Sequence, residues 1–170
     1  QLKRLDRFKK LNSFAEKNLD KIDFIFLLSL FIIDGTDNTD YFFFKFKISK
    51  KNQKRIKLID SFYKDKINIK SLGQKNLDKI LYFNGRQAVL DIIYYKLFTS
   101  NKVEKNLIKI VEVYKHKHIP DMPIVANDLI NKYKIKEGKL LGNKLKMLEE
   151  TWIQNGFVIT EKQIQKIIKN

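Results

Sequence analysis

The sequence contains no cysteine, and this absence removes two classes of site. The chain forms no disulfide and offers no thiolate ligand to a metal ion. Its two histidines do not by themselves make a usual zinc site. We therefore predict no metal ligand within this chain. Because it also has no complete catalytic or phosphate-loop motif, we predict no catalytic residue and no bound cofactor.

Long hydrophobic runs are also missing. Residues 24–33 are strongly apolar, but Asp23 and Asp34 flank them, and about 20 apolar residues are needed to cross a bilayer. No segment combines a strongly basic face with exposed apolar anchors, as a membrane-surface helix would. The chain begins with Gln1 and has no signal-peptide layout. We expect a cytoplasmic protein without a membrane partner, whose beginning is missing or processed.

Arginine is scarce in an otherwise basic chain. Lys and Arg number 35 against 19 Asp and Glu, a formal net charge of +16, yet only four of the basic residues are arginine. This charge predicts attraction to a polyanion, most simply RNA, because neutralised phosphates release counterions. The chain is also rich in Lys, Asn, Ile and Phe, a mixture that AT-rich codons produce. Part of the positive charge therefore reflects codon usage and not selection for RNA binding.

Two sequence motifs that would indicate nucleotide binding or nucleotidyl transfer are incomplete in this chain. Residues 138–144, GKLLGNK, lack the Gly-Lys-Ser/Thr ending and the preceding hydrophobic strand of a phosphate-binding loop. A nucleotidyltransferase holds two carboxylates on a strand to position Mg²⁺. Asp37 and Asp40 instead lie in the polar segment 35–40, which we interpret as a turn.

The sequence does contain a series of helical patterns. They predict an all-α fold, an elongated array of about seven to nine short helices with no catalytic α/β head domain. Residues 41–48 alternate poorly and form either a short helix or an extended link. Pro120 and Pro123 interrupt the helical patterns, so we divide the chain into a body-like region, residues 1–118, and a tail-like subdomain, residues 119–170.

The helix expected from Lys139 has the clearest pattern. Four of its apolar residues recur at spacings of four, three and four, which places them on one helical face that we expect to be buried. They are Leu141, Leu145, Leu148 and Trp152. Asn155-Gly156 ends this helix.

The neighbouring helices have recognisable starts. Asn127 or Asp128 caps a short helix that precedes the turn at Gly138. Thr160 and Gln163 have the spacing of a capping box, so we expect a last helix beyond them.

This order of features resembles the C-terminal end of bacterial class II tRNA nucleotidyltransferases, the CCA-adding enzymes and related poly(A) polymerases. The resemblance covers roughly the last fifty residues. The matching positions are Pro120-x-x-Pro123, Asp128-Leu129-Ile130, Gly138-x-x-x-Gly142, Leu145-x-x-Leu148 and Trp152 followed by Gly156-Phe157. The chain departs from the family pattern at Ala126, where the family usually has Gly, and at Lys139, where it has Pro.

The resemblance implies a role in tRNA 3′-end processing. In that family a separate head carries the carboxylates that bind Mg²⁺, and a neck selects CTP or ATP; neither motif is found in this chain. The body and tail would grip the tRNA acceptor arm and elbow while a head domain, in cis or in trans, adds CMP or AMP. We therefore expect no nucleotide addition by this chain alone. The alternative is a non-catalytic RNA-binding component of a ribonucleoprotein.

Seven basic residues are candidates for contacts with tRNA or another structured RNA. They are Arg86, Lys102, Lys105, Lys109, Lys136, Lys139 and Lys144. Arg86 either meets a phosphate or forms a surface salt bridge. The lysines at 102, 105 and 109 share the outer side of a helix that Ser100 or Asn101 caps. The last three surround the start of the helix at Lys139. Either the backbone N–H groups there donate hydrogen bonds to an RNA phosphate, or the glycines serve only to let the helix pack closely.

Aromatic side chains are a second means of binding RNA, because they stack on unpaired bases. Trp152, Tyr114 and Tyr95 occupy apolar faces, so we assign them to the core. Tyr94 does not, and it stays a candidate for stacking.

Overall fold

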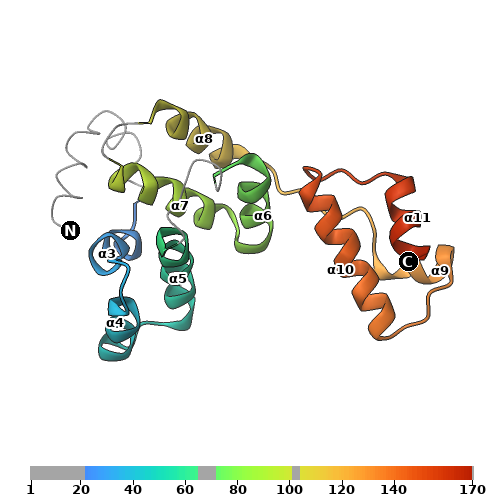
Figure 1. The fold of residues 1–170 in the computed structure, drawn as a ribbon, viewed down its shortest axis with the longest axis horizontal. Coiled ribbons are helices and arrows are strands. Elements are labelled where there is room, and N and C mark those ends of the chain that lie inside the picture. Colours follow the sequence, from blue (N-terminus) through green and yellow to red (C-terminus); the bar gives the residue numbers. More distant parts are fainter. Residues whose placement is uncertain (1–21, 65–71, 101–103, 170) are drawn as a thin grey trace. The chain divides into compact units, whose positions relative to one another are not determined.

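The computed structural model describes residues 22–64, 72–100 and 104–169 (Figure 1). Within these residues it contains nine α-helices, α3 to α11, and no strand. The predicted all-α class is confirmed. The helices belong to two compact units, which we call the N-terminal and the C-terminal unit.

The N-terminal unit comprises the described parts of residues 1–72 and 84–117. Its helices are α3 (Phe24–Ile32), α4 (Asn38–Phe46), α5 (Lys50–Lys64), α7 (Arg86–Thr99) and α8 (Lys105–His116). Helix α7 is central, since it packs against α3, α5 and α8. Ten of its 14 residues are buried, and a helix that is apolar on all sides is normally enclosed on all sides.

A charged cluster joins three helices of this unit. Arg55 of α5 donates two hydrogen bonds to the carboxylate of Asp91 in α7, the one from its Nη2 atom at 2.8 Å. Gln87 donates to the same carboxylate at 2.9 Å. Arg55 also pairs with Asp23, whose carboxylate caps α3 by accepting from the Phe26 N–H at 2.9 Å. Asp91 is thus buried with its charge compensated.

The two carboxylates of this cluster respond differently to their surroundings. Burial raises the pKa of Asp91, although the hydrogen bonds from Arg55 oppose this rise. Burial is also the largest influence on Asp23, but the hydrogen bonds from Arg55 and from the Phe26 amide outweigh it and hold the pKa of Asp23 below its usual value. Asp23 is half exposed, so water also solvates its negative charge.

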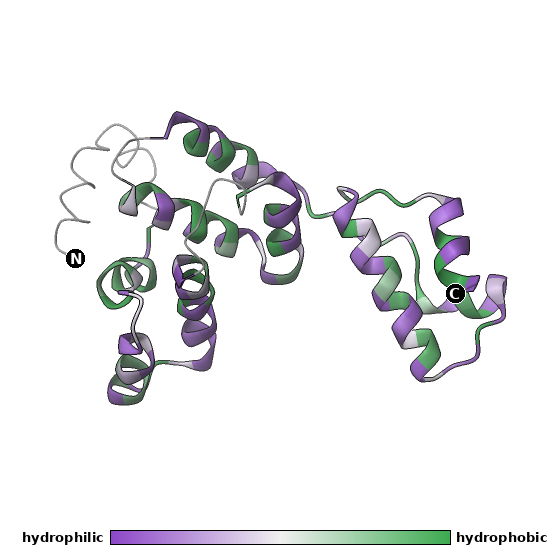
Figure 2. Cartoon of the chain, viewed as in Figure 1, coloured by the Kyte–Doolittle hydropathy of each residue, from purple (hydrophilic) through white to green (hydrophobic). Residues whose placement is uncertain are grey.

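The C-terminal unit comprises residues 73–83 and 118–170, of which 170 lies outside the described part. Its helices are α6 (Gln74–Asn84), α9 (Ala126–Tyr133), α10 (Lys139–Gln154) and α11 (Glu161–Lys169). Helix α10 packs against both α9 and α11. Figure 2 shows that α10 and α11 alternate between hydrophilic and hydrophobic residues, as two-faced helices do. Leu129, Leu141, Leu148 and Ile164 form the core.

The predicted pattern of α10 is confirmed. Leu141, Leu148 and Trp152 are buried, and Leu145 is half-buried against the core. The helix begins after Gly138, whose φ of +130° few other residues adopt, and it ends at Gln154. Gly156 follows with a φ of +71°.

The predicted cap of α9 is wrong, whereas that of α11 is confirmed. Helix α9 begins at Ala126, so Asp128 lies in its first turn and accepts a hydrogen bond from the Val125 N–H at 3.1 Å. Before α11, the Thr160 N–H donates to Gln163 Oε1 at 2.9 Å, and the Gln163 N–H donates to Thr160 Oγ1 at 3.4 Å. These two bonds form the expected capping box.

Two helix boundaries in the N-terminal unit differ from the sequence prediction. Residues 38–46 form α4, so the polar segment 35–40 is a turn only in its first part. The Asp37 carbonyl accepts from the Asp40 and Tyr41 amides, which starts the helix. Helix α8 begins at Lys105 and not next to Ser100, whose hydroxyl donates to Glu104 Oε1 at 3.1 Å.

Candidate nucleic-acid interface

Three of the predicted RNA-contacting residues lie on the surface of the N-terminal unit. Arg86 begins α7, is exposed, and donates from Nη2 to the Lys117 carbonyl oxygen at 3.2 Å. Lys105 and Lys109 are exposed on α8. None of the three forms an ion pair with an acidic residue of the described ranges. Lys102 lies outside the described residues.

Lys144 has an internal role that the sequence prediction did not foresee. Its side chain is buried, and its Nζ atom donates to the Ile167 carbonyl oxygen at 2.7 Å. Ile167 lies in the last turn of α11, where unsatisfied carbonyls and the helix dipole favour a cation. We therefore exclude Lys144 from the proposed RNA contacts.

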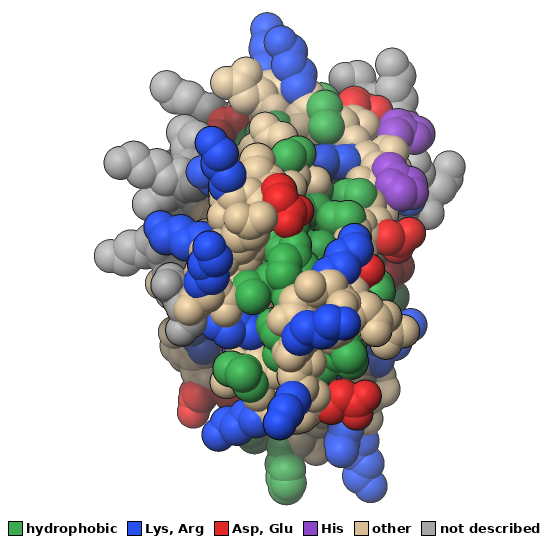
Figure 3. All heavy atoms as spheres, turned by 90° about the vertical axis from the view of Figure 1, so that its right-hand side faces the viewer, with side chains coloured by type: hydrophobic (Ala, Val, Ile, Leu, Met, Phe, Trp, Pro, Cys, Tyr) green, Lys and Arg blue, Asp and Glu red, His purple; other side chains and the backbone are tan. Residues whose placement is uncertain are grey.

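Lys136 and Lys139 belong to a larger group of cations. Together with Lys132 and Lys134 they form what we call the lysine loop, which runs from the end of α9 to the start of α10. All four side chains are exposed, and none pairs with a described acidic residue. Glu137 is the one acidic residue between the first and the last of them. In Figure 3, which looks onto the C-terminal unit, lysine and arginine side chains lie around a strip of hydrophobic ones.

The lysine loop is held by the residues between its lysines. Tyr133 and Ile135 pack against the core of the C-terminal unit, so alternate positions point inward and the lysines between them stay outside. The Tyr133 hydroxyl donates to Glu161 Oε1 at 2.6 Å, and this bond raises the pKa of Tyr133. Lys134 has a φ of +57°, and its N–H bonds to the Ile130 carbonyl at 3.1 Å. The lysines therefore project from an anchored backbone.

A cavity of about 300 Å³ lies between α6 and α10. Helix α6 supplies Lys75, Asn76, Lys79 and Phe83, and α10 supplies Glu150, Ile153 and Gln154. This site is not predictable from the sequence. Its two halves are far apart in the chain, and no local pattern marks α6 and α10 as partners.

Aromatic packing holds α6 against α10 beside this cavity. Tyr82 and Trp152 meet edge to face with ring centroids 5.5 Å apart, and Phe157 lies 5.0 Å from Trp152. The Tyr82 hydroxyl donates to Glu149 Oε1 at 2.7 Å. This hydrogen bond, together with burial, raises the pKa of Tyr82 to about 12. Tyr82 therefore keeps its proton, and can donate this bond, at pH values where an ordinary tyrosine has begun to ionise.

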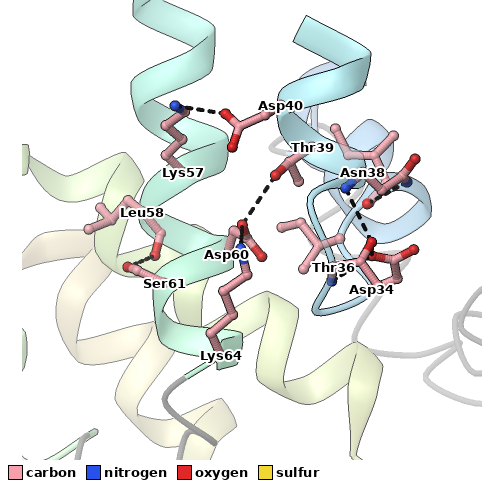
Figure 4. Close-up of polar contacts among 12 residues, drawn as sticks. Asp34, Thr36, Asn38, Thr39, Asp40, Lys57, Leu58, Asp60, Ser61 and Lys64 are labelled. Atoms are coloured by element: carbon pink, nitrogen blue, oxygen red, sulfur yellow. Dashed lines mark hydrogen bonds and ion pairs between the residues drawn. The ribbon is translucent and has the colours of Figure 1, made fainter.

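Three carboxylates near α4 contact neighbouring side chains, although the buried Oδ1 atom of Asp60 has no hydrogen-bond partner (Figure 4). Asp34 accepts from the Thr36 hydroxyl at 2.7 Å, and Asp40 pairs with Lys57 at 2.9 Å. The buried Asp60 pairs with Lys64 at 2.9 Å and accepts from the hydroxyl of Thr39 at 3.2 Å. Among the described residues, no group of three or more His, Asp or Glu side chains is placed to hold a metal ion.

Tyr94 belongs to the core, so its selection as a stacking candidate is wrong. The side chain is 1% exposed, and its ring meets Phe26 edge to face at 6.0 Å. Burial raises its pKa to about 12. The periodicity of one helical face does not reveal this burial, because α7 is enclosed on all sides.

Exposed aromatic side chains instead gather on α4. Phe44 is 87% exposed, and Tyr41 and Phe46 are more than half exposed. The Lys45 Nζ atom lies 5.7 Å from the Tyr41 ring centroid and 5.9 Å from that of Phe46. Helix α4 carries one acidic residue, Asp40, and one basic residue, Lys45, so it has exposed aromatic side chains but no strongly basic face.

No described helix has both the length and the apolar character needed to cross a membrane.

No protein-family model, curated protein or solved structure matches the chain. The likeness to tRNA nucleotidyltransferases therefore rests on the sequence motifs alone.

Proposed function

We propose that this chain binds structured RNA, with tRNA as the first candidate, through the lysine loop of its C-terminal unit. The observation that carries the proposal is the set of four exposed lysines between α9 and α10, for which the described residues supply no acidic partner. Four like charges within eight residues repel one another, and a polyanion relieves that repulsion. Arg86, Lys105 and Lys109 of the N-terminal unit are proposed as further phosphate contacts, separate from the lysine loop.

The lysines of the loop indicate that the chain contacts the phosphate backbone of structured RNA. Lysine ammonium groups contact phosphates as point charges and read no base sequence. Helical RNA is recognised mainly through its shape and its backbone. Lysines that project from an anchored loop match this mode. The family resemblance adds the more specific proposal that the chain is the tRNA-gripping part of a CCA-adding or poly(A)-adding nucleotidyltransferase and acts with a head domain.

Replacing the four loop lysines with glutamine tests the proposal. Each phosphate contact contributes about 0.7 to 0.9 to the slope of log Kobs against log salt. We therefore expect K132Q/K134Q/K136Q/K139Q to lower the magnitude of that slope for tRNA by about three to four. Fluorescence anisotropy with labelled tRNA across a salt series measures this slope.

The chain offers a matched control for that variant. Lys47, Lys50, Lys51 and Lys54 are four exposed lysines within eight residues of the N-terminal unit, and K47Q/K50Q/K51Q/K54Q removes the same charge. We expect this control to change the slope by less than half as much. Equal losses from both variants would mean that net charge, and not the lysine loop, attracts the RNA.

The exposed aromatics of α4 favour a second candidate function. A ribonucleoprotein component would cover Tyr41, Phe44 and Phe46 with a neighbouring protein, since exposed apolar patches commonly mark interaction sites. Co-purification separates the two functions. Recovery of a nucleotidyltransferase head domain favours the first, and recovery of ribosomal proteins favours the second.

A further inference from the structure

The cavity between α6 and α10 is lined by two facing pairs of polar side chains. Lys75 and Lys79 are four residues apart on α6, and Glu150 and Gln154 are four residues apart on α10, so each pair lies on one side of its helix. The lysines supply positive charge, whereas Glu150 supplies negative charge. One wall of the cavity is thus cationic, and the other offers hydrogen-bond acceptors and an amide.

These charges do not neutralise one another. Neither lysine forms an ion pair with Glu150 or with any other acidic residue in the part of the chain that the structure describes. The two ammonium groups lie on the exposed side of α6. They remain available to an anionic ligand.

Phe83 gives the cavity an aromatic surface. Its side chain is 51% exposed, and it lines the cavity at the end of α6. Tyr82 meets the ring edge to face with centroids 5.1 Å apart, which limits the ring's freedom to move. An anchored, accessible ring is a platform on which a planar ligand can stack.

We propose that this cavity is a subsite for one unpaired nucleotide of the bound RNA. The base stacks on Phe83, and Lys75 and Lys79 hold its phosphates. A volume of about 300 Å³ is at the lower end of small-ligand pockets and admits a single nucleotide but no duplex. The proposal rests on the proposed function, because the nucleotide belongs to an RNA that the lysine loop also holds.

Glu150 gives the subsite a preference among bases. An ionised carboxylate only accepts hydrogen bonds, so it favours a base edge with an amino group. Adenine presents one and uracil does not. We therefore expect an unpaired adenine to bind more tightly than an unpaired uracil, and E150Q to reduce this difference because an amide both donates and accepts.

Three RNA hairpins of equal stem length test the subsite: one fully paired, one with a single bulged adenine and one with a single bulged uracil. We expect the protein to bind the adenine-bulged hairpin about tenfold more tightly than the paired one, because stacking on an aromatic side chain contributes strongly for each base. F83L should abolish this preference while leaving binding of the paired hairpin unchanged. K75Q/K79Q should weaken binding of the bulged hairpin more than that of the paired hairpin.

The control for the second variant is K162Q/K166Q, an exposed lysine pair with the same spacing on α11. We expect it to affect both hairpins equally. Equal binding of bulged and paired hairpins by the wild type, or a preference that survives F83L, would overturn the subsite alone. Failure of the wild type to bind any hairpin would overturn the proposed function as well. Because Phe83 and both lysines are exposed, far-UV circular dichroism should be unchanged in every variant.

Discussion

Asp91→Ala is expected to destabilise the protein by about 3 to 5 kcal/mol. The Asp91 carboxylate is 1% exposed and accepts hydrogen bonds from Arg55 and Gln87. Its removal leaves the Arg55 guanidinium, which is 17% exposed, with Asp23 as its remaining partner. The cost of a largely buried cation without its main counter-ion exceeds the net contribution of the ion pair itself. Urea denaturation followed by circular dichroism measures the change.

A double variant distinguishes a buried charge from lost packing. Replacing both partners, as in R55M/D91L, removes the uncompensated charge, so we expect it to be more stable than D91A. Asp121→Ala, an exposed substitution outside the cluster, should change stability by less than about 0.5 kcal/mol. A loss below about 1 kcal/mol in D91A would contradict the central position that we give to this cluster.

Trp152→Ala is expected to cost about 3 to 5 kcal/mol and to unfold the C-terminal unit under mild conditions. Trp152 is 1% exposed and touches the rings of Tyr82 and Phe157, so it links α6 and α10. Alanine leaves a cavity among these rings that the surrounding side chains cannot fill. Thermal unfolding followed by circular dichroism measures the loss.

Leu140→Ala is the control for this substitution, since Leu140 lies on the same helix with its side chain 59% exposed. We expect a change of less than about 1 kcal/mol. Because Trp152 is the single tryptophan of the sequence, its fluorescence in wild-type protein reports on the environment of this unit. Similar stabilities of W152A and L140A would contradict the assignment of Trp152 to the core.

The sequence predicted the elements whose signals are local. The spacing of Leu141, Leu148 and Trp152 predicts α10 because one face of a helix carries the information. The capping box of Thr160 and Gln163 spans only four residues, so it too can be predicted from the local sequence. The cap of α9 was misassigned because Asp128 stabilises a helix start equally well from within the first turn.

The remaining features depend on contacts between distant segments. Tyr94 is buried because α3, α5 and α8 enclose α7, and no periodicity in α7 shows this. The buried position of Lys144 is not visible in the sequence, because its acceptor, the Ile167 carbonyl, lies on another helix. The cavity at Lys75, Phe83 and Glu150 exists only once α6 and α10 are packed together.

The most direct test of RNA binding compares tRNA lacking its terminal CCA with duplex DNA of equal charge. Binding of the purified chain to both is measured across a salt series. The account predicts that tRNA binds more tightly at every salt concentration and shows a steep salt dependence, because shape and phosphates are recognised together. Equal binding to both nucleic acids, lost for both at moderate salt, would contradict it and would mean that the charge of +16 attracts any polyanion without selecting RNA.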